Sequence, residues 1–538
     1  MKNRLLKIRR DTSKWSIYLL IICLFVALPI GTIFFNLIEG PGETWDHLVA
    51  YLMYDYIQNS ILLILGSSLI AFVLGVSSSW IVARYHFPFR KQLEWLLIVP
   101  LAIPSYIAAY AYAGIFDYGG FIQSQTGFKM DIMNIYGLVF IMGISLYPYV
   151  YVAARAFFLN QSYNIIEASK LLGANEFKTF FKLLLPLARP AIVGGLILVL
   201  MEVLNDYGAA KYYGINTFTT GIFRAWFALE EPETAIYLSA LLLSLIFGFI
   251  LLEKWQRRKK RFFNTTKNHQ QLKRLQIPSK LKVVLLCIVL IPVTFGFLIP
   301  VLQLCYWALL TYKEVFTPEF VSIALQSLLV ALTAAFCAVS FALLLIYLTK
   351  WNRLSFMKSF SKIGVVGYAI PGAVIAVGVL IPTLSIDRWL VKFFQNTMDL
   401  QIGFIINGTI IALLYAYVVR FLAVAYNPIE AASLKIGASF SESSRILGKG
   451  NVHTFFKIEF PLLKQAIVSG FILVFVDVIK ELPLTLILKP YGVNTLAVKA
   501  YEYASDELIN EAALPSLLII VTGIIPIIFL NQIISKDA

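Results

Sequence analysis

Long apolar runs dominate this chain and leave few choices of fold. Twelve of them follow one another along the 538 residues. Each is close to the ~20 residues that a helix needs to cross the apolar core of a bilayer. Only 14% of residues are charged and the mean hydropathy is +0.78, which excludes an ordinary soluble protein of this length. We therefore predict an all-α integral membrane protein with twelve transmembrane helices near 16–37, 59–82, 93–115, 135–158, 187–205, 235–252, 282–310, 321–348, 363–383, 403–424, 464–487 and 514–534.

The segments between the runs differ in charge on the two sides of the membrane. The N-terminus and the segments after runs two, six and eight are rich in Lys and Arg, whereas those after runs one, five and eleven are rich in acids. Because Lys and Arg gather in cytoplasmic loops, both termini are predicted to be cytoplasmic. The same rule explains the net charge of +15 without a nucleic-acid partner. Run 16–37 lacks a small-x-small cleavage site and is interpreted as a retained helix.

A polar motif occurs twice, in the loops after runs four and ten, with the copies 275 residues apart. Its members are Glu167, Ala168, Gly173 and Pro186 in the first loop, and Glu442, Gly448 and Pro461 in the second. The pattern predicts two short helices around a left-handed glycine turn, with the proline beginning the next span. The duplication indicates two homologous six-helix halves, 1–252 and 281–538, joined by a basic linker, 253–280, that is either a plain connector or a site for anionic lipid.

Two interpretations of Glu167 and Glu442 compete. Asn164 and Ser439 precede them by three residues, which is the spacing of a helix cap. Capping alone does not need Gly and Pro at the same distances in both halves. We therefore favour a docking element for a partner protein, since loops on rigid scaffolds often carry function.

These loops resemble the Glu-Ala-Ala loop of permease subunits of ATP-binding-cassette importers, although the triplets here are Glu-Ala-Ser and Glu-Ser-Ser. The resemblance covers nearly the whole chain and implies the MetI-like fold of type I importers. It also implies that 162–186 and 437–461 are coupling loops. The implied partners are two copies of an ATPase subunit, one per loop, and a periplasmic or extracellular substrate-binding protein. The implied location is a bacterial inner membrane.

No catalytic role is predicted for this chain. It contains no GxxxxGK[ST] phosphate loop, no nucleophile triad and no His or Cys spacing of a metal site. We expect no bound cofactor and no resident metal, with ATP used by the partner ATPase.

Four carboxylates form a second repeat at the same offset, late in runs five and eleven. Glu202 corresponds to Asp477 and Asp206 to Glu481, and each pair is spaced i, i+4 on one helix face. Acids in a membrane are costly unless they face water, a partner or a substrate path, and oxygen ligands suit hard cations. The four residues therefore either line a substrate path or cap helix ends.

The substrate is suggested by a narrower resemblance. Segments Glu202–Trp226 and Ile370–Leu380 resemble the fused permeases of ferric iron importers. Relatives with the same architecture import thiamine or aminoethylphosphonate, and an acidic path does not separate ferric iron from thiamine, since both are cationic. An ion-driven secondary transporter is a further alternative, but it needs no pair of matched docking loops.

Overall fold

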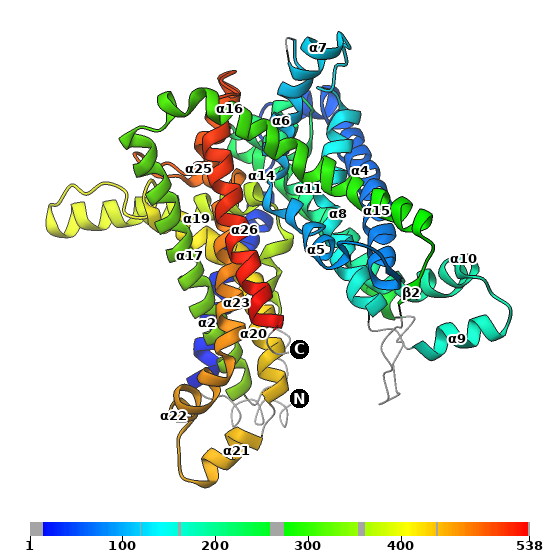
Figure 1. Ribbon diagram of the computed structural model, residues 1–538. Coiled ribbons are helices and arrows are strands. Elements are labelled where there is room, and N and C mark those ends of the chain that lie inside the picture. The colour runs from blue at the N-terminus through cyan, green and yellow to red at the C-terminus, as the bar shows by residue number, and fades with distance from the viewer. Residues whose placement is uncertain are drawn as a thin grey trace.

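The structure is a computed structural model that describes residues 14–118, 120–159, 163–258, 274–352, 361–436 and 439–535. Helices make up almost all of it (Figure 1). The first half contains α2 (Lys14–Asn36), η1 (Leu37–Glu39), α3 (Trp45–Tyr51), α4 (Met53–Arg84), β1 (Tyr85–His86), α5 (Arg90–Leu96), η2 (Val99–Ala102), α6 (Ser105–Phe116), α7 (Phe121–Thr126), α8 (Ile135–Leu159), α9 (Tyr163–Leu171), α10 (Glu176–Thr179), η3 (Phe180–Leu184), α11 (Leu185–Asn205), α12 (Gly208–Tyr212), α13 (Phe218–Phe223), η4 (Arg224–Ala228) and α14 (Pro232–Arg258).

The second half repeats this order with few changes. It contains β2 (Leu275–Gln276), α15 (Ser279–Val293), η5 (Thr294–Leu298), α16 (Ile299–Val315), α17 (Pro318–Trp351), η6 (Ile363–Ala369), α19 (Gly372–Met398), α20 (Ile410–Ile436), α21 (Ser439–Ile446), α22 (Asn451–Thr454), η7 (Phe455–Glu459), α23 (Phe460–Ile479), α24 (Pro483–Leu488), α25 (Leu496–Ser505) and α26 (Ala513–Ser535). Much of the linker, 259–273, lies outside the described residues, and α14 runs past the predicted boundary at 252.

The all-α membrane architecture is confirmed. Within the described ranges, ten helices are long and apolar enough to span a bilayer. The third predicted span, 93–115, is not one straight helix, because its two parts meet at 91°. The twelfth predicted span is the helix α26, Ala513–Ser535.

Proline causes the breaks in spans three and nine. Pro104 and Pro371 have the same backbone angles, φ −56° and ψ 143°, and helices α6 and α19 begin directly after them. A 3-10 helix, η2 or η6, ends just before each break. Since proline disfavours helical geometry in the residue before it, the helix stops there and restarts in a new direction.

Each half has a three-helix core, and the first span of each half packs on the other half. Helices α4, α8 and α11 pack together, as do α17, α20 and α23. Helix α2 contacts α17 and α19 of the second half, while α15 and α16 contact α4 and α6 of the first (Figure 1). Strands β1 and β2 pair in parallel, Tyr85 with Leu275, and attach the end of the linker to the first half. The halves are therefore interlocked.

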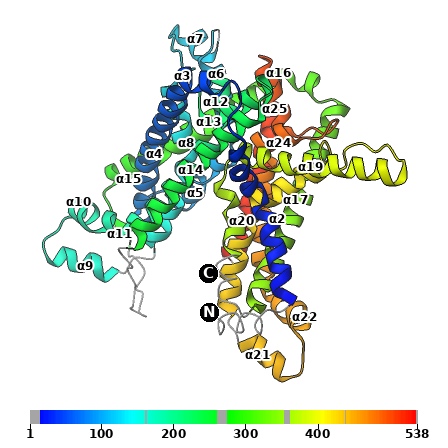
Figure 2. The same cartoon turned by 180° about the vertical axis from the view of Figure 1, so that it is seen from behind.

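The two polar loops lie at one end of the molecule, on opposite sides. Both views show α9 and α10 on one side and α21 and α22 on the other, with the cores of the two halves between them (Figures 1 and 2). We call 162–186 and 437–461 the repeated loops, and this end of the molecule the loop end.

Candidate functional site: two repeated loops and a central pocket

Both repeated loops have the helix–turn–helix form that the sequence predicts. Gly173 and Gly448 adopt φ of +80° and +74°, a left-handed backbone conformation that residues other than glycine rarely take. They separate α9 from α10 and α21 from α22. The prediction that Pro186 and Pro461 begin the next spans is wrong: each lies inside one continuous helix, Glu176–Asn205 or Asn451–Ile479, just after a π-helical segment, η3 or η7. Proline lacks the N–H of a regular helical turn, and such irregular turns are a common response to it.

The predicted cap at Asn164 is wrong. Helix α9 begins at or before Tyr163, so Asn164 lies inside the helix and Glu167 is not in its first turn. In the second loop, Ser439 and Glu442 do lie in the first turn of α21, but the Ser439 side chain is outside the described part of the structure. Glu167, Ala168 and Glu442 are exposed, which leaves them available to a partner.

A serine–threonine hydrogen bond closes each loop in the same way. Ser169 Oγ lies 2.9 Å from Thr179 Oγ1, and Ser444 Oγ lies 2.7 Å from Thr454 Oγ1. Both residues of the second pair are 275 positions after those of the first. Ser169 and Ser444 are the third residues of the Glu-Ala-Ser and Glu-Ser-Ser triplets, at the position where the Glu-Ala-Ala loop has alanine. Each bond joins the two short helices across the glycine turn.

Removing these hydroxyls is expected to loosen both loops. A hydrogen bond contributes about 1 kcal/mol, so Ser169→Ala with Ser444→Ala is expected to speed amide hydrogen exchange in each loop about fivefold. Exchange in α8 and α20 should not change. Ser169→Thr with Ser444→Thr keeps the hydroxyls and serves as the control; unchanged loop exchange in the alanine variant would contradict the role given to the bond.

The tips of both loops carry exposed apolar side chains that are not part of the predicted motif. Leu171 and Leu172 are 89% and 87% exposed, and Ile446 and Leu447, at the same positions of the second loop, are 86% and 76% exposed. Apolar residues gathered on an exposed loop outside the spans mark a surface for protein contact. The sequence signal that could have found these side chains is the apolar pair directly before each motif glycine.

Ion pairs attach each loop to a span of its own half. Arg84, at the end of α4, donates two hydrogen bonds to Glu176, at 2.8 and 3.2 Å, and Lys170 lies 2.6 Å from the same carboxylate. In the second half, Lys350 in the last turn of α17 lies 2.5 Å from the buried Glu459. Movement of a loop would therefore pull on the adjacent transmembrane core.

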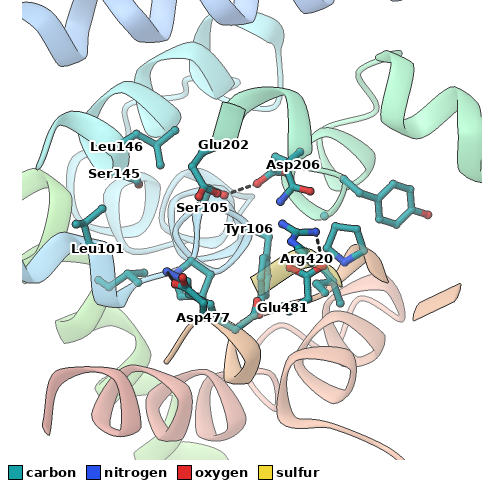
Figure 3. A pocket seen from close by; sticks show the side chains of 18 of the residues that line it. Leu101, Ser105, Tyr106, Ser145, Leu146, Glu202, Asp206, Arg420, Asp477 and Glu481 are labelled. Atoms are coloured by element: carbon teal, nitrogen blue, oxygen red, sulfur yellow. Dashed lines mark hydrogen bonds and ion pairs between the residues drawn. The ribbon is translucent and has the colours of Figure 1, made fainter. Parts of the chain in front are cut away.

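The four predicted carboxylates do come together. Glu202, Asp206, Asp477 and Glu481 line one pocket between the halves, which we call the central pocket. Figure 3 shows Glu202 and Asp206 on one side and Asp477 and Glu481 on the other. Glu202 lies in α11 and Asp477 in α23, but Asp206 and Glu481 lie just after the ends of these helices, so the predicted i, i+4 spacing on one helix face is wrong for both pairs. Helices α12, α13, α24 and α25 follow these acids in the chain and are largely buried, so the carboxylates lie inside the molecule.

Two of the four carboxylates have structural partners, as the capping interpretation predicts. Asp206 accepts hydrogen bonds from the Ser105 hydroxyl and, at 2.8 Å, from the backbone N–H of Ala209 at the start of α12. Glu481 accepts from the backbone N–H of Leu484 at 3.0 Å and pairs with Arg420 at 3.0 Å. Both acids hold short helices in place.

The other two carboxylates are held by side chains only. Glu202 accepts hydrogen bonds from the hydroxyls of Tyr149, at 3.2 Å, and Tyr368, at 3.3 Å. Asp477 pairs with Lys480 one turn along the chain, at 2.9 Å. Because neither caps a helix, these two acids are the better candidates for contact with a substrate.

The central pocket is also where the two halves are bonded to each other. The backbone N–H of Gly372 donates to Asn205 Oδ1 at 2.7 Å, and Tyr368 reaches Glu202 from the opposite half. A Cβ atom at Gly372 would collide with Arg420 Nη1 and lie 2.6 Å from Glu481 Oε1, so a larger residue here would displace the two charged side chains of this ion pair. A change in the pocket is therefore coupled to the contact between halves.

The charges in the pocket do not form a metal-ligand set. Among the described residues, no three His, Cys, Asp or Glu side chains are grouped to hold a metal ion. Among its described lining residues, the cationic side chains are Arg420 and Lys480, and each is paired with one of the four carboxylates. Carboxylates thus outnumber cations by two, which favours a cationic guest.

Sequence reasoning missed Arg420, Lys480 and the two tyrosines. Arg420 lies inside the apolar run 403–424 and is 5% exposed. A charge inside a transmembrane run is by itself a signal for function or pairing. The 275-residue repeat does not point to Arg420, because the residue 275 positions earlier is Ser145.

Comparison with known proteins gives consistent matches. Residues 71–261 and 318–538 match the family described as the binding-protein-dependent transport system inner membrane component. The Fe(3+)-transport system permease protein FbpB 2 of Haemophilus influenzae is 24% identical over 97% of this chain and 99% of its own length. The sulfate transport system permease protein CysT of Escherichia coli is 27% identical over 37% of this chain and 73% of its own. The molybdate/tungstate transport system permease protein WtpB of Methanocaldococcus jannaschii is 29% identical over 36% and 75%.

Proposed function

Since the chain belongs to the family of binding-protein-dependent transport system inner membrane components, we propose that it is the permease of an ATP-driven importer of ferric iron. The observation that carries the proposal is the central pocket, where two carboxylates from each half converge and outnumber the cations. A relative that spans nearly the whole chain is an Fe(3+)-transport permease, which agrees with a trivalent cation as cargo.

The repeated loops provide the route for energy. We place the loop end in the cytoplasm, with both termini, because the basic segments lie on that side of the predicted topology. One ATPase subunit binds each loop, with Leu172 and Leu447 as apolar contacts. When ATP binding closes the two ATPases, the loops approach each other, and the pairs Arg84–Glu176 and Lys350–Glu459 carry that motion to α4 and α17.

The halves then rock about the central pocket. An extracytoplasmic binding protein delivers the substrate at the end opposite the loops. The hydrogen bonds of Asn205 with Gly372 and of Glu202 with Tyr368 join the halves, so they must break or rearrange as access changes. Rigid-body motion around a site between repeats is a known basis of alternating access.

Sulfate and molybdate permeases also resemble parts of the chain, so an oxyanion is the main competing substrate. The central pocket argues against it, because Arg420 and Lys480 are both paired with carboxylates and offer no free cation. Thiamine is a cation and suits the same charge balance, whereas aminoethylphosphonate carries a phosphonate that does not.

Neutralising Glu202 is expected to reduce iron uptake at least tenfold. Glu202→Gln removes one charge but leaves an oxygen that accepts from Tyr149 and Tyr368, so the fold should be unaffected. Initial rates of radiolabelled ferric iron, thiamine and sulfate uptake are compared in cells that carry the intact chain or the variant. Glu319→Gln, an exposed site at the start of α17, is the control. Iron uptake that is independent of the chain, with thiamine or sulfate uptake that depends on it, would overturn the substrate assignment.

A further inference from the structure

A second pocket lies next to the central pocket and has the opposite charge. It is lined by α12, the turn after it, α13 and η4, and its charged lining residues are Lys211 and Arg224. No carboxylate is among its described lining residues. Asn216 adds an amide, and Phe223 and Phe227 form an apolar wall. We call it the basic pocket.

Tyr207 belongs to the lining of both pockets. Its ring stacks on Phe223, with centroids 3.6 Å apart, and its hydroxyl lies 3.4 Å from that of Tyr501 in the other half. The two pockets therefore meet at this side chain.

The internal repeat supplies a comparison for this pocket. At an offset of 278 residues, Lys211 corresponds to Lys489, Asn216 to Asn494, and Arg224 to Glu502. In the second half, Lys489 pairs with Glu502 at 2.8 Å, and Asn494 donates to the same carboxylate at 3.3 Å. The lysine of that half is thus neutralised within the repeat.

The first half replaces this acid with a second cation. Arg224 donates a hydrogen bond to Asn216 Oδ1, at 3.0 Å, and also interacts with the Tyr56 hydroxyl. No ion pair of Lys211 or Arg224 is found in the described part of the chain. Arg224 is only half-buried and Lys211 is exposed, so both can reach a guest from solvent. Guanidinium donors suit carboxylate and oxyanion geometry, and a lysine adds charge.

We propose that the basic pocket binds a small anion, an oxyanion or a carboxylate, between Lys211 and Arg224. This anion takes the place that Glu502 occupies in the second half. The anion site rests on the pocket alone. Its role rests on the proposed function: the anion arrives as a ligand of ferric iron and is held in the basic pocket, while the cation passes Tyr207 to the carboxylates of the central pocket.

Anion binding is tested on the full chain in nanodiscs of one fixed lipid composition, by equilibrium dialysis with radiolabelled orthophosphate and with citrate. The intact chain is expected to bind at least one of them saturably. Arg224→Glu, which copies the second half, is expected to weaken that binding at least tenfold, and Lys211→Gln several-fold. Lys313→Glu makes the same kind of charge change at an exposed site on α16 and should have no effect. Absence of saturable binding by the intact chain, or equal binding by Arg224→Glu, would overturn the proposal.

Uptake of radiolabelled ferric citrate distinguishes the sources of the anion. If the anion travels with iron, Arg224→Glu loses uptake along with binding, whereas Lys313→Glu retains both. If binding is lost but uptake persists, the pocket is a site for free anion, and its role in iron delivery is wrong. If the intact chain binds the anion but imports no iron, the anion site stands and the proposed substrate fails.

Discussion

Replacing Leu172 and Leu447 together by Asp is expected to abolish transport and to release the ATPase, while the chain remains folded in the membrane. Both side chains are more than three-quarters exposed, so the substitution removes no packing within the chain. Burying a leucine in a partner's cleft contributes about 1.5–3 kcal/mol, and a carboxylate in its place must also be desolvated. Two such losses weaken association more than 100-fold, since each 1.4 kcal/mol is a factor of ten.

Co-purification of the ATPase with the tagged chain measures this effect. Leu172→Met with Leu447→Met keeps an apolar side chain of similar volume and should retain the ATPase and most of the uptake. Single Asp variants should show which loop contributes more. Normal ATPase recovery with both aspartates present would show that the exposed leucines are not the contact surface, and the motif residues would then need a different role.

Replacing Arg420 by Ala is expected to destabilise the protein by about 3–5 kcal/mol, because it leaves Glu481 buried without its partner. Arg420 and Glu481 are each about 5% exposed, and their ion pair lies where α19, α20 and α24 meet the central pocket. Thermal unfolding followed by size-exclusion fluorescence measures the loss, and we expect uptake to fall with it.

A double variant separates charge from contact. Arg420→Gln with Glu481→Gln removes both charges but leaves an oxygen that accepts from the N–H of Leu484, and it keeps the charge balance of the pocket. It is expected to recover most of the stability lost by Arg420→Ala. If Arg420→Ala is as stable as the intact chain, or if the double variant is no better than the single one, the ion pair does not have the structural role assigned to it.

Much of the fold and part of the site could be predicted from sequence because both are duplicated. The 275-residue offset identified the two loops and the four carboxylates, and helix chemistry predicted the turns at Gly173 and Gly448. The breaks in spans three and nine fall at prolines, Pro104 and Pro371, so their cause is also local. These features are local, so the chain alone specifies them.

Features without a counterpart in the other half were not predicted. Arg420 has no counterpart in the repeat. The ion pairs that attach the loops to the spans also differ, with Arg84–Glu176 in one half and Lys350–Glu459 in the other. The packing of each half's first span against the other half was also not predicted. An apolar run long enough to cross the bilayer does not indicate which helices it will contact. The cap assigned to Asn164 failed because α9 begins earlier than its cap signal suggests.

The central claim is that ATP-driven iron import passes through this chain and depends on its two loops. The most direct test is uptake of radiolabelled ferric iron in cells that lack the chain, carry the intact chain, or carry Gly173→Asp with Gly448→Asp. An aspartate is strained at the positive φ of both turns, so the loops lose their shape while the spans are untouched. We predict that the intact chain restores uptake and the double variant does not. Full uptake and normal ATPase binding by the double variant would contradict the account.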